Sequence, residues 1–199
     1  RRSSDLLFMA VALTNIDKKL DAIQDMQKEM MDFLVQKEKA DLKGNLNFLI
    51  DVFNNYKYNW NNEMYKNSNH IKVLDIRQEA EKKIAFYREQ IISKVNKKSF
   101  IHSDQTVNKQ LQDVQDRFKD YQLALYILGF SSFLEVMLLG NFDADYLTGI
   151  SDTLEKYSLK YKELYTKCYD EIESYSSTSV QSSMLKGIAK ASSSFGKLV

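Results

Sequence analysis

Residues 121–142 read YQLALYILGFSSFLEVMLLGNF and contain a single charged side chain, that of Glu135. The part from 123 to 130 is apolar on every side of a helix. A helix of this length could cross the hydrocarbon core of a bilayer, which is about 30 Å thick. It could equally be a helix that is buried on all sides at the centre of a bundle. The residues that would serve either role are Leu125, Leu128, Phe130, Phe133, Leu134, Glu135 and Leu138.

Two features of this stretch favour burial in a bundle. Glu135 would be costly in lipid. The apolar face also continues upstream through Val114 and Phe118, where charged residues fill the positions between, as in a soluble helix. We therefore expect 121–142 to form the central helix of the fold, with conditional membrane insertion as the alternative.

The same helical periodicity extends over most of the chain. Apolar residues recur every three to four positions in the segments 6–34, 42–60, 73–95, 107–139 and 147–168, and the first of these has the regularity of a coiled-coil stripe. The chain contains no proline and only six glycines, so it has few turns and its helices should be long. These features predict an all-α fold, an elongated antiparallel bundle of about five long helices with coiled-coil-like seams.

The boundaries between these helices are predicted from turn and cap residues. Between 34 and 46 the register slips, which fits either a tight turn at 43–45 or one continuous helix with a stutter. Residues 66–70 are rich in Asn and Ser and predict a loop. Residues 140–143 predict a helix C-cap followed by a new N-cap. We assign 4–176 to a single helical-bundle domain and 177–199 to a Ser/Gly/Ala-rich tail that could hold a short helix.

Charge is distributed unevenly along the chain, although the net charge is only +1. Residues 57–98 carry ten Lys/Arg and five Asp/Glu, whereas residues 104–155 carry three and nine. Antiparallel neighbours of opposite charge attract each other, so we expect the third and fourth helices to pack together.

No arrangement of residues typical of an enzyme or a metal site is visible. The only histidines, His70 and His102, lie in or beside predicted loops, and neither has the Glu three residues earlier that di-iron bundles require. Cys168 lies on an apolar face, where a small hydrophobic role is expected. Phosphate-binding loops and nucleophile turns are absent. We therefore predict a non-enzymatic protein without cofactor or metal.

Two aromatic segments could instead form contact surfaces. Tyr157, Tyr161, Tyr165 and Tyr169 follow one another at i+4 spacing beside lysines, so they form either a surface for a partner or an aromatic border of the core. Residues 56–60 and Tyr65 mix aromatics and lysine as single-strand binders do. Because no wider basic groove accompanies them, we predict a helix end there and no nucleic acid partner.

Composition bears on compartment and source. A lone cysteine is typical of a reducing compartment and slightly favours the cytoplasm, while a secreted bacterial protein stays an open alternative. Lysine far outnumbers arginine and asparagine is frequent, as in AT-rich bacterial genes. We therefore predict a bacterial protein.

Long antiparallel helices with one hydrophobic segment near a helical turn resemble the layout of α-helical pore-forming toxins of the cytolysin A type. The likeness covers the general layout and rests on no residue motif. It implies an apolar segment that is hidden in the soluble form and released at a membrane. Our first prediction of function is a helical bundle that acts through protein–protein contacts, with a protein partner or with a second copy of itself. The alternative is a membrane-active protein that uses the helix 121–142.

Overall fold

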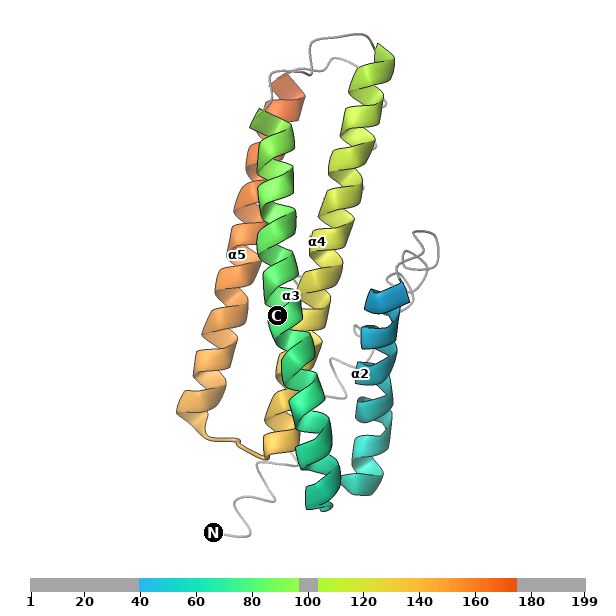
Figure 1. Ribbon diagram of the computed structural model, residues 1–199. Coiled ribbons are helices and arrows are strands. Elements are labelled where there is room, and N and C mark those ends of the chain that lie inside the picture. The colour runs from blue at the N-terminus through green and yellow to red at the C-terminus, as the bar shows by residue number, and fades with distance from the viewer. Residues whose placement is uncertain (1–39, 97–103, 175–199) are drawn as a thin grey trace.

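The described part of the chain, residues 40–96 and 104–174 of a computed structural model, consists of four helices and no strand (Figure 1). The helices are α2 (Ala40–Asn59), α3 (Glu63–Asn96), α4 (Asp104–Leu139) and α5 (Ala144–Ser174). Successive helices run in opposite directions, and α3, α4 and α5 are long (Figure 1). The all-α prediction is therefore confirmed. The predicted helix at 6–34, the tail at 177–199 and His102 lie outside the described residues.

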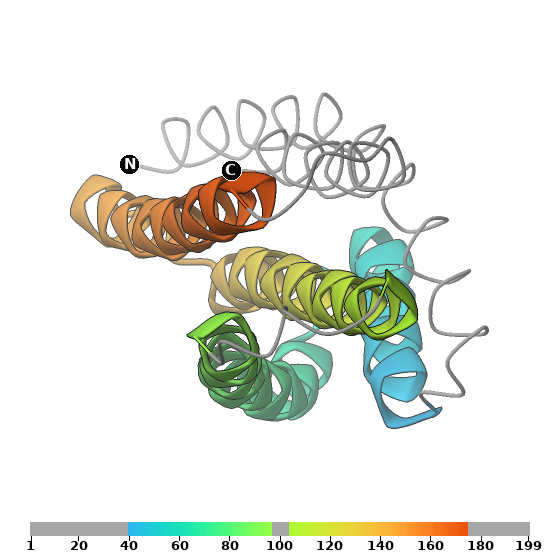
Figure 2. The same cartoon turned by 90° about the horizontal axis from the view of Figure 1, so that it is seen from above.

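α4 is the central helix of this arrangement. Seen from above, it lies between α2, α3 and α5, and it contacts all three (Figure 2). The most extensive contact joins α3 to α4 along their length, as the opposite charges of these segments predicted. Lys94 of α3 lies 3.2 Å from Asp113 of α4, one of the pairs of opposite charge between them.

The core is built around the apolar part of α4. Every side chain from Tyr121 to Leu128 is buried, so this part of the helix contacts neighbours on all sides. By length and composition α4 is apolar enough to cross a membrane, and 78% of its most apolar window is buried inside the bundle. The structure thus shows 121–138 in the central position with most of its side chains buried, whereas Leu139 is exposed, α4 ends there, and residues 140–142 belong to the connection to α5.

The predicted loop at 66–70 is wrong, because these residues belong to α3. The turn lies earlier, at 60–62, where the Asn62 side chain accepts a hydrogen bond from the Tyr65 amide and caps α3. Asn69 and Ser68 fit inside the helix because their side chains donate to the carbonyls of Tyr65 and Met64, four residues earlier. Local composition alone does not distinguish this use of Asn and Ser from a loop.

The tight turn considered at 43–45 is also excluded, since these residues lie within α2. The predicted apolar face of α2 is buried as far as Tyr56. The helix ends at Asn59, however, so Trp60, the last residue of that predicted face, lies in the turn and is exposed. Whether the helix continues to residue 34 concerns residues outside the described part.

The predicted connection between α4 and α5 is confirmed. Gly140 has a φ of 61°, which glycine adopts at little cost, and its amide donates to the Met137 carbonyl. The Asp143 side chain then accepts hydrogen bonds from the amides of Asp145 and Tyr146 and caps α5. The buried Tyr56 hydroxyl also donates to the Met137 carbonyl, which ties α2 to the end of α4.

Candidate functional site

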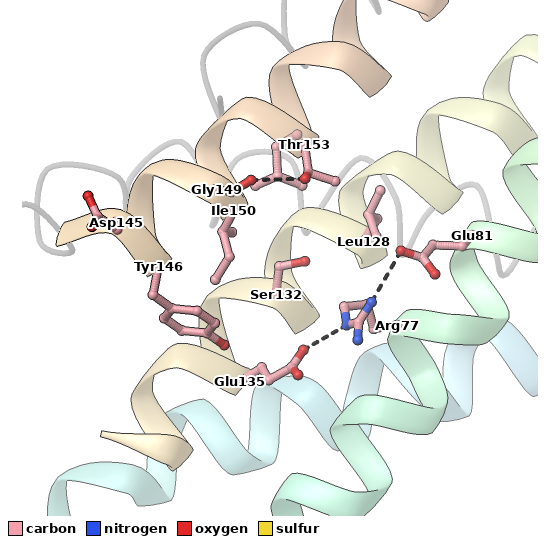
Figure 3. Close-up of a pocket in the computed structure, with 11 residues that line it drawn as sticks. Arg77, Glu81, Leu128, Ser132, Glu135, Asp145, Tyr146, Gly149, Ile150 and Thr153 are labelled. Atoms are coloured by element: carbon pink, nitrogen blue, oxygen red, sulfur yellow. Dashed lines mark hydrogen bonds and ion pairs between the residues drawn. The ribbon is translucent and has the colours of Figure 1, made fainter. Parts of the chain in front are cut away.

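A groove opens where the first half of α5 passes α3 and α4 (Figure 3). Its volume is about 360 Å³, within the range of small binding sites. Its walls combine apolar and charged side chains from three helices. The lining residues are Arg77, Glu81, Leu128, Ser132, Glu135, Asp145, Tyr146, Gly149, Ile150, Thr153 and Leu154.

Arg77 organises the charged side of the groove. Its Nε lies 2.7 Å from Glu135 Oε2, and its Nη1 lies 3.2 Å from Glu81 Oε1 (Figure 3). His70, two turns earlier on α3, places its Nε2 3.7 Å from the other oxygen of Glu135. The single charge of the apolar stretch is therefore held by α3, and its side chain is only 14% exposed. Such a partly buried carboxylate is stable only because a cation lies against it.

This charged group is not predicted by the sequence alone. The sequence places His70 in a loop and leaves Glu135 an isolated charge, whereas α3 presents both His70 and Arg77 to α4. The usable signal was the i, i+7 spacing of His70 and Arg77, which puts both on one face of a helix. The face shared by His70 and Arg77 can be recognised only once residues 66–70 are assigned to α3 and not to a loop.

Two tyrosines lie close to the charged group. Burial raises the pKa of the Tyr146 hydroxyl, and the Glu135 carboxylate raises it further while Arg77 lowers it. Burial likewise raises the pKa of Tyr157, with Glu81 adding to the rise and Arg77 opposing it. Both hydroxyls therefore stay protonated at neutral pH, and that of Tyr146, which lines the groove, can donate a hydrogen bond there.

The residues singled out on α4 divide between core and groove. Leu125, Phe130, Leu134 and Leu138 are buried in the core, and Phe133 is half-buried against it. Leu128 and Glu135 line the groove.

The tyrosine row of α5 packs largely into the core. The Tyr161 ring is fully buried, with its centroid 4.9 Å from that of Tyr121, and Tyr157 and Tyr165 are half-buried. The side chain of Tyr169 lies outside the described residues. Arg88 of α3 joins this cluster by donating hydrogen bonds to the Tyr121 hydroxyl and the Lys160 carbonyl. The described part of the row therefore packs into and along the core, and none of Tyr157, Tyr161 and Tyr165 lines the groove.

Two kinds of reactive group are relevant in and around this site. Among residues 40–96 and 104–174, no three His, Cys, Asp or Glu side chains are placed to hold a metal ion together. Burial raises the pKa of the Cys168 thiol to about 12, so it stays protonated at neutral pH and is a poor nucleophile. The groove offers hydrogen-bond donors, carboxylates and apolar walls that can hold a ligand in a fixed orientation.

Comparisons with protein-family models, with curated proteins and with solved structures found no match to this chain.

Proposed function

We propose that this chain is a non-enzymatic helical bundle that acts by binding a protein partner in the groove between α3, α4 and α5. The observation that carries the proposal is the combination of apolar walls, Leu128, Ile150 and Leu154, with the charged group around Arg77 in one open groove. Binding sites commonly pair such apolar contact with a few fixed polar groups.

The charges in the groove favour a partner segment that carries a basic side chain. The lining contains three carboxylates, those of Glu81, Glu135 and Asp145, and one cation, Arg77, so it has an excess of negative charge. A lysine or arginine of an amphipathic partner helix would meet these carboxylates while its apolar side chains contact Leu128 and Ile150. Such complementarity sets specificity and association rate.

Filling the groove tests this proposal. A Cβ at Gly149, in the groove wall, would meet no atom within 4 Å, so Gly149→Phe should fold normally while occupying the groove. A photo-crosslinking residue at the exposed Thr153 should then capture one partner in the parent protein and not in Gly149→Phe. The matched control is Gly44→Phe on α2, where a Cβ also meets no atom within 4 Å. Equal capture by all three proteins, or none by any, would contradict the proposal.

The second candidate is a membrane-active protein that releases α4 at a bilayer. It is favoured by one observation, the length and apolar character of α4. Release would have to expose core side chains such as Leu125 and to separate Glu135 from Arg77. This cost explains why a trigger would be required.

Gly129 offers a clean test of this candidate. It lies within the apolar stretch, yet a Cβ there would meet no atom within 4 Å, so Gly129→Lys should leave the bundle folded. At the bilayer centre a lysine costs about 3 kcal/mol, so leakage of dye-loaded anionic liposomes should fall on the order of a hundredfold. Gly44→Lys should leak like the parent protein. If the parent releases no dye, or Gly129→Lys releases as much, insertion of α4 is excluded.

A further inference from the structure

An unusual group of large apolar side chains is exposed at the end of α2, in the turn that follows and on the first part of α3. Tyr58, Trp60, Met64 and Ile71 are 72%, 48%, 80% and 64% exposed, and we refer to them as the tip cluster. They fall within 14 consecutive residues, and Met64 and Ile71 share one face of α3 because they are seven positions apart. None of them lines the groove between α3, α4 and α5. Concentrated apolar exposure of this kind marks an interaction surface.

The charges around the tip cluster are mainly positive. Residues 57–72 contain Lys57, Lys66 and Lys72 and one carboxylate, Glu63, which lies 2.6 Å from Lys66. The Lys57 ammonium lies over the Tyr58 ring, 4.8 Å from its centroid. The segment 57–72 therefore has a net charge of +2, although Lys72 also acts on Glu79, two turns further along α3. The acidic Asp51 and Asp75 lie on either side of this segment, further along α2 and α3.

The cluster also lies at an extremity of the fold. In Figure 1 the α2–α3 turn forms the lower end of the described helices, and the connection from α4 to α5 lies nearby. Asp143 in that second connection caps α5 through its carboxylate. The turn can therefore meet a flat surface ahead of the rest of the described bundle.

We propose that the tip cluster docks this protein onto an anionic lipid surface. Trp and Tyr prefer the interface between water and hydrocarbon, and Met64 and Ile71 supply apolar area to bury there. Lys57 and Lys72 are placed to contact lipid headgroups of negative charge. Docking requires neither release of α4 nor an occupied groove, so it does not rest on either function proposed above.

Lipid fits this surface better than the other two classes of partner. A single-stranded nucleic acid would need a basic track along its backbone, and the excess here is only two charges. A protein partner would have to supply a pocket that receives these projecting side chains, whereas a bilayer needs no pocket. A bilayer accepts a small convex apolar tip surrounded by lysines.

Docking can be followed by tryptophan fluorescence, because Trp60 is the only tryptophan of the chain. The full chain is mixed with vesicles of phosphatidylcholine, with or without about one third phosphatidylserine. We expect the Trp60 emission to shift to shorter wavelength and acrylamide quenching to decrease with the anionic vesicles, and both effects to weaken as salt is added. An oligothymidylate in place of vesicles should produce no response.

Three variants connect this signal to the tip cluster. Met64→Asp should abolish the shift, and Phe86→Asp, at another exposed apolar position of α3, should leave it unchanged. Lys57→Gln with Lys72→Gln keeps the apolar side chains and should weaken binding about thirtyfold, because each lysine contributes about 1 kcal/mol at an anionic surface. Circular dichroism checks that each variant is folded.

Three results would overturn the proposal. These are no shift with anionic vesicles, an equal shift in the lysine double variant, or a response to the oligothymidylate alone. The lysine double variant keeps the test valid even if Met64→Asp does not fold.

Discussion

Replacing Leu125 with alanine should lower the free energy of unfolding by about 3 kcal/mol. Leu125 is fully buried in the stretch of α4 where every side chain from 121 to 128 contacts the interior. The truncation removes apolar contacts and leaves a cavity that the surrounding helices can close only in part. For a chain of this size the melting temperature should fall by about 10 °C. Urea unfolding followed by circular dichroism measures the change directly.

The matched control is Leu159→Ala on α5. The same side-chain atoms are removed there, but Leu159 is 54% exposed, so its substitution should change the free energy of unfolding by less than about 0.5 kcal/mol. Equal effects at the two positions would mean that α4 is not the central helix of the folded protein in solution.

Replacing Arg77 with methionine should lower the free energy of unfolding by about 2 kcal/mol. It leaves the Glu135 carboxylate, 14% exposed, with His70, 3.7 Å away, as its remaining ion-pair partner among the described residues. Removing one partner of a fully buried ion pair costs about 3–5 kcal/mol, and the effect is smaller here because Arg77 is 26% exposed. Thermal and urea unfolding at neutral pH both report the loss.

A double variant separates this ion pair from simple packing. Arg77→Met with Glu135→Gln removes both charges, so it should be more stable than Arg77→Met alone. Lys83→Met on the same helix breaks a surface pair with Glu79 and should change stability by less than about 0.5 kcal/mol. If the double variant is the least stable of the three, Arg77 stabilises the fold by packing and not by pairing with Glu135.

The position of the Arg77–Glu135 pair, partly buried between two helices, fits a groove that binds a partner. The two side chains cross from α3 to α4 at the wall of the groove, and they hold charge at a place that apolar residues could fill. Replacing such pairs with apolar residues is often neutral for stability. We therefore expect binding measurements to show that the charges of this pair, at the wall of the groove, contribute to holding the partner.

The sequence alone determined the helical class, and it favoured a central place for the apolar part of α4 over insertion in a membrane. Apolar residues every three to four positions can be buried only on the faces of packed helices, and a stretch that is apolar on all sides needs neighbours on all sides. The α4–α5 connection was predictable for a similar reason, because Gly140 and Asp143 act on the backbone within a few residues of themselves. The opposite charges of the third and fourth helices were visible in composition.

Only the tertiary structure decided which side chains meet. The burial of Tyr161 against Tyr121 and the pairing of Arg77 with Glu135 depend on the rotation and axial offset of one helix against another. The start of α3 was misplaced because asparagines that cap or donate within a helix resemble those of a loop. Periodicity is a property of one helix, whereas a groove or an ion pair between helices is a property of several helices in fixed register. The local pattern contains no information on that register.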